Sequence, residues 1–279
     1  MDTKINYNKL FDDFNKNIRD YIIRNYGPGG ILTDFLVHLP RYKEIGEIIL
    51  NFSSESSNIL EIGVHHGYTY KLLEYLERNN FIGIDLDSSD CLFPELKYKI
   101  VRFDLELIPT THLPLGDNYF DIIIFTEVFE HLHPYKVKDI MQDIKRILKP
   151  EGIIIFSTPN LAALENRISL LLGGIGKYRR GSIVPNCHTR EYTMKELLIF
   201  LIKGGFEIVY SSYQSPRQYI MLDSKNQFIE GNVLKGLILN PSLKNFARLI
   251  IGGIKTIVPS FREGITLILR KPNPHLSGD

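Results

Sequence analysis

Short apolar runs alternate with longer amphipathic stretches from residue 58 onward. The runs have the length and β-branched content of buried strands, and between them apolar residues recur every three or four positions, as in helices that face a sheet. Because right-handed crossovers connect such strands, the pattern predicts a doubly wound α/β fold with helices on both faces. The last predicted helix starts with a capping box, Thr193 followed by Glu196. The predicted strands are 58–63, 81–85, 99–104, 120–126, 152–158, 206–211 and 265–271, and the predicted helices are 68–78, 135–148 and 193–203.

The first 52 residues follow a different pattern, which predicts a helical cap. Apolar residues recur at helical spacing from Leu10 to Ile22, and a second periodic stretch over 31–52 contains Pro40, so we expect two short helices there. A turn rich in glycine separates the two stretches at 27–30. We therefore predict a cap over 1–52 and an α/β domain over 53–279, with insertions at about 161–190 and 214–260 that complete the cap.

Composition is that of an ordinary globular protein. Charged residues make up 23% of the 279 residues and hydrophobic residues 44%, which argues against a disordered chain. Lysine and arginine number 33 against 32 acidic residues, which excludes a strongly basic nucleic-acid coat. Two cysteines, Cys91 and Cys187, are too few for a disulfide framework, and neither a secretory signal nor a run of about 18 apolar residues is present. We expect a cytoplasmic protein.

The balanced charge hides two basic segments. Residues 166–190 carry five basic residues and no acidic one, and residues 231–279 carry seven basic residues against two acidic ones. Such an excess attracts an anionic substrate or membrane surface, although a solvated face has the same composition. The stretch 233–259 also mixes apolar and basic residues as an interfacial helix does, with Pro241 interrupting it. Both peripheral membrane contact and an ordinary pair of capping helices fit this stretch.

Three predicted strands end in residues that suit a cofactor with a nucleoside. Glu61, Gly63 and Gly67 lie where the first strand passes into a helix, and glycine there lets the backbone approach a ligand closely. Asp85 ends the second strand about twenty residues later, where a carboxylate accepts hydrogen bonds from both ribose hydroxyls. Asp104 ends the third strand, within reach of an adenine amino group.

The glycine spacing and the next two strands distinguish between cofactor classes. A dinucleotide enzyme is an alternative, but Val64 and His65 follow Gly63, so the G-x-G-x-x-G fingerprint is absent. The stretch 117–160, with the turn LKPEG after its helix and STPN at its end, resembles the fourth and fifth strands of class I S-adenosylmethionine-dependent methyltransferases. The resemblance covers about residues 55–211 and extends less distinctly to 271. One departure is His65, which replaces the family's frequent middle glycine.

This resemblance implies a fold, a cofactor and an activity. It implies a seven-stranded, mostly parallel sheet whose last strand is antiparallel, and methyl transfer from S-adenosyl-L-methionine. By the resemblance, Glu61 lies near the amino end of the cofactor, Asp85 binds the ribose, and Asp104 with Leu105 flanks the adenine. The other positions that the resemblance assigns to the cofactor are Ile62, Gly63, Gly67, Leu86 and Thr126.

A cluster of titratable residues follows the fourth strand. If a helix begins there, Glu127, Glu130 and His131 share one face at i, i+3 and i+4. Two carboxylates and an imidazole are costly to crowd together, and a divalent ion such as Mg, Mn, Fe or Zn would satisfy all three. His188 is a fourth candidate ligand. The arrangement resembles metal-dependent O-methyltransferases of ubiquinone biosynthesis and small-RNA 2′-O-methyltransferases, in which the ion holds the acceptor hydroxyls and lowers the pKa of the attacked oxygen.

Metal-free members of the same family carry a similar motif, so two readings stay open. In those proteins the first glutamate touches the cofactor and the histidine acts as a general base or only packs. Glu127, Glu130 and His131 are therefore candidate catalytic residues with or without a metal. We expect a small-molecule, sugar or lipid-linked acceptor, for which an anionic group would suit the basic segments. An RNA 2′-O-methyltransferase is disfavoured by the near-neutral charge, and a non-catalytic binding protein is a further alternative; the oligomeric state is left open.

Overall fold

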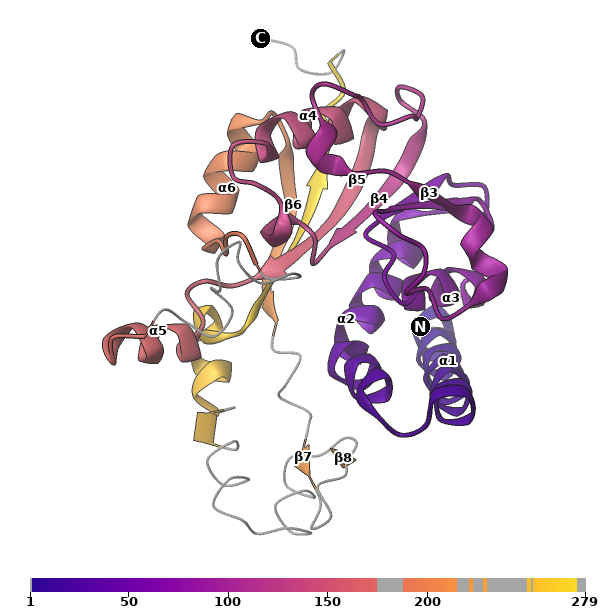
Figure 1. Cartoon of the computed structure of the whole chain (residues 1–279), viewed down its shortest axis with the longest axis vertical. Helices are drawn as coiled ribbons and strands as arrows, with labels where there is room; N and C mark the ends of the chain where they lie inside the picture. Colours follow the sequence, from indigo (N-terminus) through magenta and orange to yellow (C-terminus); the bar gives the residue numbers. More distant parts are fainter. Residues whose placement is uncertain are drawn as a thin grey trace.

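A seven-stranded sheet forms the centre of the computed structural model (Figure 1), which describes residues 2–174, 188–214, 221–222, 228–229, 250–251 and 253–274. The strand order is β3-β2-β1-β4-β5-β9-β6. All seven predicted strands are present, which confirms the predicted α/β class. Their bounds are β1 (Ile59–Ile62), β2 (Phe81–Asp85), β3 (Ile100–Arg102), β4 (Phe120–Thr126), β5 (Leu148–Pro159), β6 (Glu207–Gln214) and β9 (Gly264–Arg270).

The strand directions place a binding edge at the middle of the sheet. Strands β1 to β5 pair in parallel, whereas β9 lies antiparallel between β5 and β6, as predicted for the last strand. The chain leaves β1 toward β2 on one side and later returns to β4 on the other. Ligands of open α/β sheets bind at such a switch point, outside the carboxyl ends of the strands.

Two layers of helices cover the sheet, because successive strand residues point to opposite faces. On one face Ile59 and Ile122 pack against α1 (Asp2–Tyr26), α2 (Gly30–Phe52) and α3 (Tyr68–Tyr75). On the other face Leu60 and Ile123 pack against α4 (Val137–Ile147) and α6 (Met194–Lys203). Figure 1 shows the α1, α2 and α3 group on one side of the sheet and α4 and α6 on the other.

The second N-terminal helix differs from the prediction of two short helices. Helix α2 runs without interruption from Gly30 to Phe52, with Pro40 inside it. An internal proline costs a helix about 3 kcal/mol, because it removes a backbone hydrogen bond and crowds the preceding turn. Phe35 and Tyr42, on either side of Pro40, are buried and stack with ring centroids 6.0 Å apart. The packing of these two rings therefore outweighs the tendency of Pro40 to end the helix.

Several smaller elements refine the predicted boundaries. The capping box at Thr193 and Glu196 is confirmed at the start of α6. The LKPEG segment does not only close a helix: β5 already begins at Leu148, and Glu151 adopts a left-handed φ of 62°. The insertion near 161–190 contains α5 (Leu164–Leu171), and the one near 214–260 contains the paired β7 (Met221–Leu222) and β8 (Phe228–Ile229). Within the described ranges the 3₁₀ turns are η1 (Pro94–Lys99), η2 (Leu105–Leu107), η3 (Phe129–His131) and η5 (Pro259–Phe261).

Parts of the predicted insertions lie outside the described residues. These parts include Lys177 to Gly181, Cys187 and most of the stretch 233–259. Among the described helices, none is long and apolar enough to cross a membrane.

We expect Gly83→Ala to destabilise the fold. Gly83 lies within β2, and a Cβ there would be 2.0 Å from the Tyr70 hydroxyl and 2.4 Å from Val64 Cγ2. Tyr70 is fully buried and has little room to move, so overpacking should lower the free energy of unfolding by about 3 kcal/mol. Urea unfolding measures this change. Gly116→Ala is the control, because its Cβ would meet no described atom within 4 Å; equal losses in both variants would contradict the packing argument.

Candidate functional site

A cavity of about 1130 Å³ opens at the carboxyl ends of β1, β2 and β4. Eight of the nine predicted cofactor positions line it, and so do all four predicted metal ligands. The exception is Gly67, which caps α3 in a left-handed conformation. A Cβ on Gly67 would lie 2.9 Å from Cys91 Sγ, so this glycine serves the packing of the loop. The cofactor positions on the cavity wall are Glu61, Ile62, Gly63, Asp85, Leu86, Asp104, Leu105 and Thr126.

Glu61 and Gly63 form the floor of the cavity beside β1. Glu61 is 3% exposed, and its Oε2 has no hydrogen-bond partner among the described residues. Burial, with the charge of Asp85, raises the pKa of Glu61 to about 8 against the opposing effects of a hydrogen bond with Thr69 and of the charge of Arg41. Gly63 has a φ of +82°, and a Cβ on it would lie 2.3 Å from Val128 Cγ2. The turn therefore requires glycine at this position.

Asp85 ties the loop after β1 to the end of β2. The backbone N–H of His65 donates to Asp85 Oδ2 at 2.9 Å. His65 has a left-handed φ of 46°, a conformation for which glycine is better suited. The departure from the family pattern is thus accommodated by backbone strain at His65, while its amide supports the Asp85 carboxylate.

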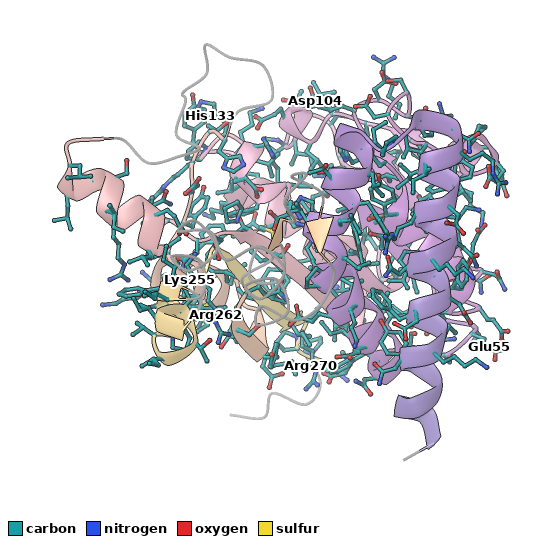
Figure 2. The ribbon with its side chains drawn as sticks, turned by 90° about the horizontal axis from the view of Figure 1, so that it is seen from below. Glu55, Asp104, His133, Lys255, Arg262 and Arg270 are labelled. Atoms are coloured by element: carbon teal, nitrogen blue, oxygen red, sulfur yellow. The ribbon has the colours of Figure 1, made fainter. Side chains whose placement is uncertain are left out.

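Asp104 lies at the third strand end, on the wall formed by η2. Its Oδ1 accepts a hydrogen bond from the Glu106 N–H at 2.9 Å, and Glu106 Oε1 in turn accepts one from the His133 N–H at 2.6 Å. Figure 2 labels Asp104 and His133 along the same edge of the molecule. This chain of contacts fixes the wall between the ends of β3 and β4.

Glu127 lies where β4 ends, and the predicted helix does not begin there. Its backbone is left-handed with φ 57°, and only the 3₁₀ turn η3 follows. Glu127 Oε1 accepts from Ser157 Oγ at 2.7 Å, and Oε2 lies 3.4 Å from Arg41 Nη1. The prediction of a helix carrying Glu127, Glu130 and His131 on one face is therefore wrong. The irregular turn directs Glu127 toward Arg41 of α2 instead.

A cluster of three potential metal ligands lines the same cavity beyond Glu127. It consists of Glu130, His131 and His188. One potential ligand atom of each lies within 4.8 Å of those of the other two. Glu130 is 1% exposed, and its Oε2 accepts a hydrogen bond from Thr158 Oγ1 at 2.9 Å. Burial and the nearby charge of Glu127 raise the pKa of Glu130 well above its usual value. The described structure thus brings together three of the four predicted ligands.

A buried pair orients His188. Its Nδ1 lies 3.1 Å from Glu191 Oε1, and the other oxygen of Glu191 accepts from Asn166 Nδ2 of α5 at 3.0 Å. The Thr189 N–H also donates to the Glu130 carbonyl at 2.7 Å, which holds this loop against η3. A carboxylate beside one imidazole nitrogen is a common outer partner of metal-binding histidines.

Comparisons with known proteins agree with the resemblance noted in the sequence and with the fold. Residues 60–156 match the model of a methyltransferase domain family. A probable S-adenosylmethionine-dependent methyltransferase of Mycolicibacterium smegmatis is 30% identical over 151 residues, which are 54% of this chain and 52% of the relative. A crystal structure of a SAM-dependent methyltransferase from Archaeoglobus fulgidus shares the fold with a TM-score of 0.52 at 18% identity, covering 82% of this chain and 94% of that one.

Residues 60–156 are thus similar to a methyltransferase domain, and the relative that they resemble is a probable S-adenosylmethionine-dependent enzyme. The chain also resembles a ubiquinone biosynthesis O-methyltransferase of Rickettsia bellii, with 31% identity over 127 residues, 45% of this chain and 41% of the relative. The chain therefore spans about half the length of these curated relatives. The matched segment supplies the predicted cofactor strands and η3, while α2 and the loop at 188–191 reach the cavity from outside it.

The sequence did not indicate four side chains that line the cavity or hold its lining residues in place. Arg41 comes from the middle of α2, and nothing in the amphipathic pattern marks it. Glu191 and Asn166 lie in an insertion and meet only in the folded chain. Thr158 belongs to the STPN segment, whose position at a strand end was the one available signal.

Part of the predicted basic surface serves to hold the fold together. Lys255 is 3% exposed and pairs with both Glu165 and Glu263. Arg262 donates to the carbonyls of Lys255 and Tyr213 at 3.1 and 3.0 Å, and Figure 2 shows Lys255 and Arg262 together beside α5. These two cations join the C-terminal segment to α5 and to β6. Contact of the stretch 233–259 with a membrane stays a prediction.

Proposed function

We propose that the protein transfers the methyl group of S-adenosyl-L-methionine to an oxygen atom of a small-molecule, sugar or lipid-linked acceptor, with a divalent metal at Glu130, His131 and His188. The observation that carries this proposal is that one cavity contains both the cofactor positions and a carboxylate with two imidazoles. The likeness to an O-methyltransferase of ubiquinone biosynthesis supports oxygen as the acceptor atom.

The methionine end of the cofactor fits two buried polar atoms. Glu61 Oε2 and Arg41 Nε both have no hydrogen-bond partner among the described residues. Each such buried atom costs about 1–3 kcal/mol. An α-amino acid carries an ammonium group that can donate to Glu61 Oε2 and a carboxylate that can accept from Arg41 Nε. Arg41 and Glu61 therefore suit the zwitterion of methionine.

The donor set at the other end fits a divalent ion. One carboxylate and two imidazoles are ligands that zinc, iron and manganese accept. Glu130 is buried beside Glu127, so a cation would offset the cost of its negative charge. Such an ion, when bound, would hold an acceptor hydroxyl and lower the pKa of its oxygen.

The chain's own side chains position the acceptor and remove its proton. In the transfer an oxygen–carbon bond forms while the sulfur–carbon bond breaks, so the sulfonium becomes a thioether and the acceptor proton must leave. With the ion bound, the lowered pKa of the acceptor oxygen lets this proton leave to water; without an ion, His131, 40% exposed and on the cavity wall, is the side chain that takes it. Arg41 and Ser157 hold Glu127 between the two ends of the cavity, which fixes the spacing of donor and acceptor.

Two measurements test the proposal. Calorimetry of the full chain with S-adenosyl-L-methionine should show binding, and its absence would contradict the cofactor assignment. Mass spectrometry of small molecules recovered with the protein should identify an acceptor whose mass rises by one methyl group upon incubation with the cofactor. Transfer to nitrogen or carbon instead of oxygen would overturn the acceptor part alone.

We expect cofactor affinity to rise with pH between about 6 and 8. Glu61 has a pKa of about 8 in the free protein, and the ammonium group of the cofactor should lower that pKa in the complex. Binding then releases a proton below pH 8, so affinity increases with pH by at most about tenfold per unit and levels off above 8. Calorimetry in buffers of different ionisation enthalpy measures the proton release. In Glu61→Gln the release should vanish, and an unchanged release would refute the assignment to Glu61.

An apolar surface beside the cavity favours a lipid-linked acceptor. Helix α5 begins at the cavity wall, where Glu165 and Asn166 lie, and at its other end Leu170, Leu171 and Leu172 are 51%, 86% and 82% exposed. Leucines so exposed can enter the interfacial region of a bilayer. We expect Leu171→Ser with Leu172→Ser to reduce co-sedimentation with anionic vesicles several-fold. If the double variant binds vesicles as well as the unaltered chain does, the surface argument for a lipid-linked acceptor is wrong and a water-soluble acceptor is favoured.

A further inference from the structure

A second group of potential metal ligands lies at the mouth of the cavity, apart from Glu130. It consists of Asp34 from α2 and of His65 and His66 from the loop after β1. One ligand atom of each residue lies within 4.8 Å of those of the other two, and all three residues line the cavity. The cap and the cofactor loop, which are separate in sequence, meet here.

The orientation of His66 is that of a metal ligand. Its Nδ1 lies 3.1 Å from the Asp90 carbonyl, an acceptor that places the ring proton on this nitrogen. Its Nε2 then carries a lone pair, and it faces Asp34 Oδ2 at 4.0 Å. A backbone carbonyl in this role is a common outer partner of metal-bound histidines.

The other two residues are held in place by their neighbours. The His65 ring lies against the His66 ring, with centroids 3.8 Å apart and an interplanar angle of 35°, and the backbone N–H of His65 donates to Asp85. His38, one turn further along α2, keeps its Nε2 3.5 Å from Asp34 Oδ1, which leaves Oδ2 on the side of His66. The carboxylate is therefore oriented by the helix that carries it.

We propose that Asp34, His65 and His66 form a second divalent-metal site, of the zinc class, which links helix α2 to the cofactor loop. Two imidazoles and a carboxylate are a common zinc donor set, and water completes such a site. Two ligand atoms bound tetrahedrally at about 2.0–2.1 Å from an ion lie roughly 3.3 Å apart. Side-chain rotations that move each ligand atom by about an ångström therefore bring the three atoms, now within 4.8 Å of one another, to this spacing. An ion here fastens the cap over the cavity and slows the exchange of its contents.

The test uses metal binding in a full-length chain whose other cluster is disabled. Glu130→Gln with His188→Gln serves as this background, and Co²⁺ and Zn²⁺ are the probes. We expect one equivalent of Co²⁺ with a visible ligand-field spectrum, displaced by Zn²⁺. Adding Asp34→Asn or His66→Gln to the background should weaken binding about 100-fold, since loss of even an outer partner costs 10- to 100-fold.

Matched controls separate this site from adventitious binding. His112→Gln removes a histidine that pairs with Asp143 outside the cavity, and it should leave Co²⁺ binding unchanged. Zn²⁺ should also slow hydrogen exchange in α2 and in residues 64–67 of the background, but not after Asp34→Asn. The proposal is overturned if the background binds no Co²⁺, if His112→Gln weakens binding as much as His66→Gln, or if exchange in α2 is insensitive to Zn²⁺. These readouts do not depend on methyl transfer, so the two proposals can fail separately.

Discussion

Replacement of Glu130 by glutamine should lower the rate of methyl transfer about 1,000-fold. The change keeps the size of the side chain and the contact with Thr158, but it removes the anionic oxygen that faces His131 and His188. Loss of Lewis-acid stabilisation costs several kcal/mol, and about 4 kcal/mol corresponds to a factor of 10³. The measurement is turnover of the acceptor recovered with the protein, together with metal content by mass spectrometry.

Chelation provides the comparison for Glu130→Gln. Removing the ion from the unaltered chain should reproduce the loss, and adding the divalent ion back should restore turnover only where Glu130 is present. A variant at Asp139, which lies in the first turn of α4 and does not line the cavity, should behave as the unaltered chain. Full activity after chelation would leave His131 as a metal-free base.

The second large effect is expected for Asp85→Ala. We expect the affinity for S-adenosyl-L-methionine to fall at least 100-fold, because two hydrogen bonds from ribose hydroxyls to a charged group contribute about 1.5–3 kcal/mol each. The change also removes the acceptor for the His65 amide. Calorimetry with the cofactor and with its demethylated product measures both affinities.

Asp85→Asn separates the two roles of this residue. The amide oxygen can still accept from the His65 N–H, so the loop stays in place while the charge is lost. An affinity between those of the unaltered chain and Asp85→Ala is expected. If Asp85→Ala binds the cofactor as well as the unaltered chain does, the assignment of the ribose to this carboxylate is wrong.

The sheet was predictable because its central strands, such as β1 and β4, are buried on both faces. Runs such as 122–125 are apolar without interruption, and their length, together with glycine nearby, distinguishes them from helices. The carboxyl ends of parallel strands meet at one edge of a sheet. The strand assignment alone therefore predicted that the proposed cofactor residues, such as Glu61 and Asp85, lie close together although they are far apart in sequence.

The acceptor end was less predictable, because it depends on irregular backbone. The left-handed Glu127 breaks the helical spacing that the EVFEH segment suggests, and no local pattern indicates a positive φ at a glutamate. Continuity of α2 through Pro40 is a tertiary effect, since the buried Phe35 and Tyr42 lie on either side of it. Arg41 was missed for the same reason, because its partner Glu127 lies 86 positions away in the sequence.

The unpartnered atoms of Arg41 and Glu61 belong to different layers of the molecule, one in a helix and the other in the sheet beneath it. A ligand that satisfies both acts as a non-covalent crosslink between the two. Its binding free energy then adds to the stability of the packing of α2 on the sheet, by the thermodynamic coupling between binding and folding. Binding of the cofactor would thereby protect the N-terminal helices from local unfolding. Weaker packing of those helices on the sheet would in turn lower the affinity for the cofactor.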